Sequence, residues 1–207
     1  MGWRSRGYLP HVEFAGQVQA VTFRLRDSVP ASVIRQWAEE AGGTPVSATP
    51  DARSIALARR IASFEGSGHG ACHLANPLVA EAVEATLLYD EGAAYALLAW
   101  CVMPNHIHVV VEPVPGASLS TIVQSWKSVS ARRANAVFGR TGAFWMREYH
   151  DRYIRDDTHL AAAIRYAENN PVAAGLCRTP EDWRWSSASA HRRGIAVAHR
   201  SERTSGP

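Results

Sequence analysis

The stretch CVMPNHIHVVVEP, from Cys101 to Pro113, places two histidines at the start of an apolar run. In a β-strand successive side chains project to opposite faces, so His106 and His108 lie on one face and the aliphatic residues between and after them lie on the other. The dipeptide Pro104-Asn105 is typical of a turn, and it separates this strand from the apolar run AAYALLAWCVM before it. The stretch therefore predicts two neighbouring strands, one of which carries a pair of imidazoles on a single face.

Two imidazoles on one face of a strand stand about 7 Å apart along it, close enough to hold a metal ion between them. Histidine is the commonest metal ligand, and in magnesium or manganese sites oxygen ligands usually join it. The spacing alone leaves a second interpretation open, in which His106 and His108 are packed or surface side chains without a metal.

The rest of the chain alternates between strand-like and helix-like segments. Strand-like runs cover residues 17–26, 93–103 and 106–113, and helical patterns cover residues 31–41, 52–65, 77–90, 118–138 and 158–169. We expect the last of these helices to end before Pro171, because the residue that precedes a proline disfavours helical conformation. Helices interleaved with antiparallel strands predict an α+β fold, in which helices cover a central antiparallel sheet.

Length and composition point to a single globular domain. The chain has 207 residues, of which 46% are apolar and 20% charged, as is usual for globular proteins. No apolar run approaches the roughly 20 residues that span a bilayer, and the N-terminus lacks the apolar core of a secretion signal, so we expect a cytoplasmic protein. The three cysteines are far apart and odd in number, which argues against a disulfide framework or a zinc site.

Charge is distributed unevenly along the chain. Residues 1–130 carry 9 basic and 11 acidic groups, a net charge of −2, whereas residues 131–207 carry 13 basic and 8 acidic groups, a net charge of +5. This asymmetry is a modest indication of a nucleic-acid partner. Of the 22 basic residues only Lys127 is a lysine, and a GC-rich genome, which favours arginine codons, explains most of that ratio.

Five sequence blocks, in order along the chain, resemble a known family. They are YLPHVEFAGQVQAVTFRLRDSVP (8–30), GSGHGACHLANPLVAEAV (66–83), YALLAWCVMPNHIHVVVEP (95–113), SLSTIVQSWKSVSARRANAVFGRTGAFWMREYHDRYIRD (118–156) and IRYAENNPVAAGLCRTPEDWRWSSASAH (164–191). MPNHIH followed by aliphatic residues resembles the HUH motif of single-tyrosine transposases. The blocks together resemble the REP-associated tyrosine transposases.

This resemblance implies a ferredoxin-like α+β domain and a metal-dependent enzyme. Such an enzyme cleaves and rejoins single-stranded DNA near REP-type hairpins through a 5′-phosphotyrosine intermediate. The match to RYAENNPV makes Tyr166 the nucleophile. The resemblance also makes His106, His108 and Asn170 the ligands of a divalent metal, Mg²⁺ or Mn²⁺.

The spacing of the implied nucleophile and third ligand is compatible with this role. Tyr166 and Asn170 are four residues apart and so share a helical face, and Tyr166 lies about 200° around the helix from its apolar stripe. The proline at 171 puts the geometry of Asn170 in question. Tyr149 and Tyr153, in EYHDRY, are rival nucleophiles, but neither precedes an Asn-Pro sequence.

Five basic side chains are candidates for DNA contact, because arginine and lysine bind phosphates and arginine also stacks on bases. They are Lys127, Arg132, Arg133, Arg152 and Arg155. For each of them a solvated protein surface is the alternative interpretation.

Several questions stay open on the sequence alone. We expect the transposase domain to cover residues 8–191 and residues 192–207 to form a disordered tail. A domesticated protein that binds hairpin DNA without transposition is one alternative, and an unrelated metallohydrolase that adds Glu112 to the histidines is another. The sequence does not distinguish a monomer from a homodimer, nor does it identify the hairpin.

Overall fold

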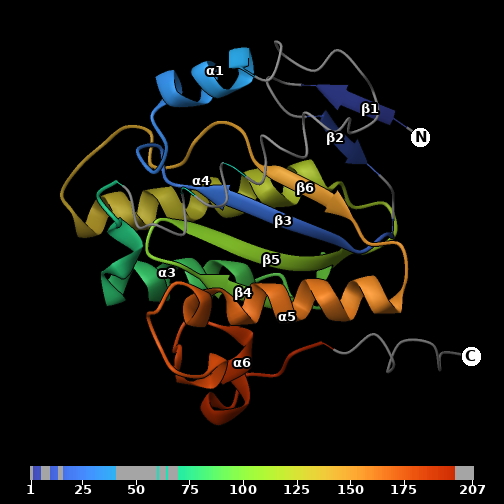
Figure 1. Ribbon diagram of the computed structural model, residues 1–207. Helices are drawn as coiled ribbons and strands as arrows, with labels where there is room; N and C mark the ends of the chain where they lie inside the picture. The colour runs from blue at the N-terminus through green and yellow to red at the C-terminus, as the bar shows by residue number, and fades with distance from the viewer. Residues whose placement is uncertain are drawn as a thin grey trace, which may run out of the picture.

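A four-stranded antiparallel sheet with helices on both faces forms the body of the molecule (Figure 1). The computed structural model describes residues 2–5, 10–13, 16–40, 60, 64 and 70–198. Its strands are β1 (Gly2–Ser5), β2 (Pro10–Glu13), β3 (Gln19–Arg24), β4 (Tyr95–Val102), β5 (His106–Pro113) and β6 (His150–Tyr153). Its helices are α1 (Ala31–Glu40), α3 (Pro77–Leu88), α4 (Leu119–Val137), α5 (Asp157–Ala173) and α6 (Ser187–Ala190), with short 3₁₀ turns at η1 (His73–Ala75), η2 (Pro180–Asp182) and η3 (His191–Arg193). The predicted α+β fold is confirmed.

The strands lie in the order β4-β5-β3-β6, and all neighbours are antiparallel. The β4–β5 hairpin turns at Pro104-Asn105, as predicted. In the register, Thr22 of β3 stands opposite both His108 of β5 and His150 of β6. The β1–β2 pair forms a separate two-stranded sheet beside β6 (Figure 1).

The main core fills the space between the sheet and helices α3 and α4. Phe23, Trp100 and Ile107 project into it from three strands, and all three side chains are buried. Trp126 of α4 donates a hydrogen bond from Nε1 to the Tyr95 hydroxyl at 2.8 Å. Burial of such large apolar side chains is the dominant favourable term in folding.

A second, smaller core lies on the opposite face, under α5. Leu98 and Val110 project from β4 and β5 and contact Leu160 of the helix. His106 and His108 share this face with Val110, because alternate residues of a strand project to the same side. The alternation of β5 therefore buries its odd-numbered aliphatic residues in the main core and leaves its histidines beneath α5.

Helix α5 begins where the sequence predicts but ends later. The Asp156 side chain caps its first turn by accepting a hydrogen bond from the His159 backbone N–H at 2.8 Å. The helix then continues through Pro171 to Ala173, so the prediction that it ends before the proline is wrong. Pro171 is buried, and the Asn170 side chain donates to the Tyr166 carbonyl at 2.8 Å, which gives this turn an extra hydrogen bond. The packed environment thus overrides the local preference.

The C-terminal segment covers the outer edge of β4. The Val102 backbone N–H donates to the Trp185 carbonyl at 2.8 Å, and the Trp100 N–H donates to the Ser187 hydroxyl at 3.1 Å. Farther on, Arg193 makes a two-pronged ion pair with the buried Glu84 carboxylate, at 2.6 and 2.9 Å.

Packed residues continue beyond residue 191, the predicted end of the domain. Ile195 and Val197 lie partly buried against the main core. The described part of the expected tail, residues 192–198, therefore contributes to the fold. Residues 199–207 and the predicted helix at 52–65, apart from residues 60 and 64, lie outside the described residues. Among the helices that the structure describes, none has the length and apolarity to cross a membrane.

Candidate active site and metal centre

Two buried histidines of β5 form the centre of the candidate site. The relative exposure of His106 is 2% and that of His108 is 5%. Their Nε2 atoms lie 2.9 Å apart, and the rings are nearly perpendicular, with centroids 4.7 Å apart. The pair of imidazoles predicted on one strand face is therefore present, with its nitrogen atoms turned toward each other.

Two neighbouring side chains fix the orientation of these rings. The Nδ1 of His108 lies 3.0 Å from the Thr22 hydroxyl, and the Nδ1 of His106 lies 2.7 Å from Asn105 Oδ1. Because an amide oxygen can only accept, this contact favours the tautomer of His106 that carries its proton on Nδ1 and has a lone pair on Nε2. The Thr22 hydroxyl can donate or accept, so it permits the same tautomer in His108.

The environment keeps both imidazoles uncharged. The pKa of His108 is lowered to about 4, chiefly by burial and also by the nearby His150, while hydrogen bonding to the Asn170 side chain opposes the shift. Burial also lowers the pKa of His106 well below its ordinary value, with smaller contributions from His108 and Arg24. Neutral imidazole is the form that binds metal.

Helix α5 places a tyrosine above this pair. The ring centroid of Tyr166 lies 5.3 Å from that of His108, at an interplanar angle of 80°. Tyr166 is nevertheless 56% exposed, as expected for a side chain that points away from the buried stripe of its helix. Asn170, one turn later, lies close enough to His108 to raise the pKa of that imidazole. The structure thus brings together Tyr166, Asn170 and both histidines.

The residues present fit a divalent metal. Two nitrogen ligands that are each about 2.1 Å from a metal ion and at right angles to one another lie about 3.0 Å apart. The observed separation of the two Nε2 atoms is 2.9 Å. The contacts of Thr22 and Asn105 with the two Nδ1 atoms resemble the outer interactions that orient histidines in known metal sites.

Oxygen ligands beyond Asn170 would come from water or a substrate. Across residues 2–5, 10–13, 16–40, 60, 64 and 70–198, no group of three or more His, Cys, Asp or Glu side chains could hold a metal ion. Glu112, the carboxylate of the metallohydrolase alternative, lies four residues from His108 on β5, about 13 Å along the strand. Glu112 is therefore too far away to bind the same metal ion as His106 and His108, which argues against the metallohydrolase alternative.

Arg152 and Arg155 lie in the part of the chain around β6. Arg152 is exposed and stands opposite Ala20 in the register, on the same sheet face as Thr22 and His108. Arg155 is exposed just after β6. Arg152 is therefore an exposed cation on the sheet face that carries the candidate site, and Arg155 follows it in the chain.

The other three predicted DNA contacts lie on α4, which covers the opposite face of the sheet (Figure 1). Arg132 and Arg133 are exposed, and Arg133 donates to the Thr86 hydroxyl of α3 at 3.3 Å. Lys127 is half-buried and donates to the Arg147 carbonyl at 2.7 Å. The five basic side chains therefore do not form one patch.

Sequence reasoning did not identify the two side chains that orient the imidazoles. Asn105 is part of the predicted turn, and its place directly before the first histidine was the available signal. Thr22 lies far from the histidines in the chain, and only the pairing of β3 with β5 brings it to His108.

Three comparisons relate the chain to known proteins. Residues 81–170 match the family described as "Transposase IS200 like". A Haemophilus influenzae protein, named as a candidate REP-associated tyrosine transposase, is 27% identical over 107 residues, which cover 47% of this chain. The alignment spans 61% of that relative, about three fifths of its length.

A solved structure shows the same fold. It is a REP-associated tyrosine transposase bound to a REP hairpin, with a TM-score of 0.51 and 17% sequence identity. The similarity covers 95% of this chain and 88% of that one. The chain is thus similar to IS200-like transposases over residues 81–170, and it shares its fold with a REP-associated tyrosine transposase.

Proposed function

We propose that the protein is a metal-dependent transposase that cleaves and rejoins single-stranded DNA beside REP-type hairpins. One observation supports this most directly: the accessible phenol of Tyr166 contacts His108, and the Nε2 atom of that buried imidazole lies 2.9 Å from the Nε2 atom of buried His106. A tyrosine packed for stability alone would bury its ring, whereas a nucleophile must be reached by a substrate.

In the proposed reaction Tyr166 acts as the nucleophile. Its phenolic oxygen forms a bond to the scissile phosphorus, and the bond from phosphorus to the 3′ oxygen breaks. The phenol proton is lost to solvent, and the departing 3′ oxygen takes up a proton from solvent. The products are a free 3′-hydroxyl and a 5′-phosphotyrosine. Because the phosphodiester is conserved in this bond, a 3′-hydroxyl can attack it and rejoin the strands without ATP.

His106, His108 and Asn170 would hold Mg²⁺ or Mn²⁺. When bound, this ion supplies positive charge next to the scissile phosphate, which an uncharged imidazole pair cannot provide. The low pKa of both histidines supports such a role, because it keeps their lone pairs available at neutral pH.

Hairpin DNA is the proposed partner. The excess of basic residues after residue 130 suits a phosphate backbone, and a solved transposase of the same fold is bound to a REP hairpin. We propose that Arg152 and Arg155 contact the strand near the histidines, and that the exposed Arg132 and Arg133 contact DNA on the α4 side. Lys127 donates to the Arg147 carbonyl inside a pocket, so we do not assign it a DNA contact.

Trapping a covalent DNA–protein adduct tests this proposal. A REP-type hairpin oligonucleotide with single-stranded flanks would be incubated with the protein and Mn²⁺, and the adduct mapped by mass spectrometry. We expect the adduct at Tyr166, its loss in Tyr166→Phe, and its retention in Tyr89→Phe. Tyr89 is the matched control because its side chain is 79% exposed but lies at the end of α3, on the other face of the sheet.

The same assay separates the enzyme from the domesticated binding protein. Hairpin binding without any adduct, in Mg²⁺ or Mn²⁺, would support a binding protein and remove the nuclease. An adduct that persists in Tyr166→Phe would move the nucleophile elsewhere. Cleavage unchanged in both His106→Ala and His108→Ala would refute the metal site.

A further inference from the structure

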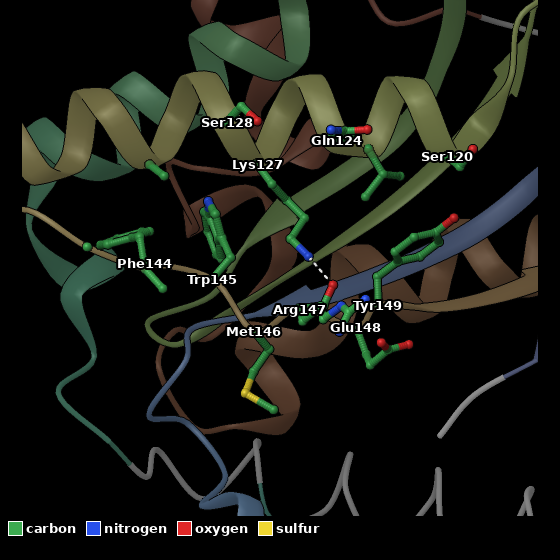
Figure 2. Close-up of a pocket in the computed structure, with 14 residues that line it drawn as sticks. Ser120, Gln124, Lys127, Ser128, Phe144, Trp145, Met146, Arg147, Glu148 and Tyr149 are labelled. Carbon is green, nitrogen blue, oxygen red and sulfur yellow. Dashed lines mark hydrogen bonds between the residues drawn. The ribbon is translucent and has the colours of Figure 1, made fainter. Parts of the chain in front are cut away.

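A pocket separate from the histidines lies between α4 and the segment 142–149 (Figure 2). Its volume is about 420 Å³. Hydrogen bonds hold its second wall in place: the Trp145 Nε1 donates to the Ser130 hydroxyl at 3.0 Å, and the Asn135 amide donates to the Gly142 carbonyl at 2.9 Å. The pocket is therefore bounded on both sides by ordered backbone.

Lys127 projects into this pocket from the middle of α4 (Figure 2). Its side chain is half-buried, and its Nζ donates to the Arg147 carbonyl across the pocket at 2.7 Å. One N–H of the amine is thus directed to the opposite wall, which fixes the position of the nitrogen. The polar side chains of Gln124 and Ser128 line the same pocket.

Lys127 is also the only lysine in the chain, where the other 21 basic residues are arginine. A guanidinium stays protonated throughout the accessible pH range, whereas an amine can lose its proton and become a nucleophile. A preference for arginine codons explains the 21 arginines but does not explain the single lysine, whose amine lies in the pocket beside Arg147.

The surroundings of Lys127 favour the uncharged amine. Its pKa is lowered to about 8, chiefly by burial, while Glu148 opposes the shift and Arg24 adds to it. Arg147 and Tyr149 are the other ionisable groups that line the pocket. A large fraction of the Lys127 side chains is therefore deprotonated slightly above neutral pH.

We propose that Lys127 is an acyl-modification site, at which the amine takes an acyl group from an activated donor that enters the pocket. The amine nitrogen forms a bond to the acyl carbon, the bond from that carbon to the phosphate or thiol leaving group breaks, and the amine proton passes to solvent. The product is a neutral amide, so the pocket loses its ammonium charge. This inference does not depend on the proposed nuclease activity.

An internal competition tests the inference. In the folded variant Arg132→Lys, the chain has one amine in the pocket and one on the exposed surface of the same helix. At about pH 8 roughly half of the Lys127 amine is uncharged, against about 0.4% of an ordinary lysine amine. We expect acetyl phosphate to acetylate Lys127 at least roughly tenfold faster than position 132, as measured by peptide mass spectrometry.

Equal or slower modification of Lys127 would overturn the proposal, and so would a preference that survives in concentrated urea. The rate at Lys127 should level off above about pH 8, while the rate at position 132 continues to rise toward about pH 10. In Glu148→Gln, checked for folding by circular dichroism, the rate should level off at a lower pH. A parallel series uses an acyl thioester in place of acetyl phosphate. If Lys127 is modified faster than position 132 with only one of the two donors, that donor gives the chemical class. If it is not modified faster with either donor, the proposal is refuted.

Discussion

The buried histidines should make the stability of the metal-free protein depend on pH. The pKa of His108 is about 4 in the folded state against 6.5 ordinarily. The unfolded chain therefore binds more protons between these values, and the free energy of unfolding falls as the pH falls from 6.5 toward 4. Between about pH 7.5 and pH 5 this single group accounts for a loss of about 2 kcal/mol, and His106 adds to the loss in the same direction.

Replacing His108 with glutamine removes the titrating group. We expect His108→Gln to lower stability at neutral pH but to lose about 2 kcal/mol less than the wild type between about pH 7.5 and pH 5. Urea unfolding at several pH values in the presence of EDTA measures this difference. The matched control is His191→Gln, since His191 is exposed, and its pH dependence should equal that of the wild type. If His108→Gln keeps the full wild-type pH dependence, the burial argument for the candidate site fails.

Three further predictions follow from contacts of the site and of the C-terminal segment. Mn²⁺ at a hundred times its Kd should raise the free energy of unfolding by about 2.7 kcal/mol, and thermal unfolding of His106→Ala should show no such increase. Asn170→Ala should weaken Mn²⁺ binding, measured by calorimetry, by roughly tenfold or more, whereas the exposed neighbour in Asn169→Ala should leave the affinity unchanged. Arg193→Ala should cost roughly 3 kcal/mol in urea unfolding, because it leaves the buried Glu84 carboxylate without its cation; a cost below about 0.5 kcal/mol would place that segment outside the cooperative fold.

Sequence patterns predict the elements whose signals are local. The apolar run of β4 and the alternation of β5 identify the central hairpin, and the period of α4 identifies the helix that covers it. β6 escapes such reasoning, because its four residues HDRY contain no aliphatic side chain and it forms only through pairing with β3.

Some residues of the candidate site can be predicted from local motifs, and others cannot. His106, His108 and Tyr166 belong to contiguous motifs, so the sequence identifies them, although their roles remain predictions. Thr22 reaches His108 only through strand register, which no local pattern specifies. At Pro171 a local pattern gives a wrong prediction. A proline usually ends a helix at the residue before it, but the packing of α5 keeps this helix continuous through Pro171.

The C-terminal segment that covers the outer edge of β4 has a consequence for folding during synthesis. All eight residues of β4 are buried, and part of this cover, Ser187, comes 87 positions after Trp100, to which it bonds. During synthesis the apolar strand therefore leaves the ribosome long before its cover exists, and an open strand edge is a template for aggregation. Chains that end before residue 183 should collect in the insoluble fraction.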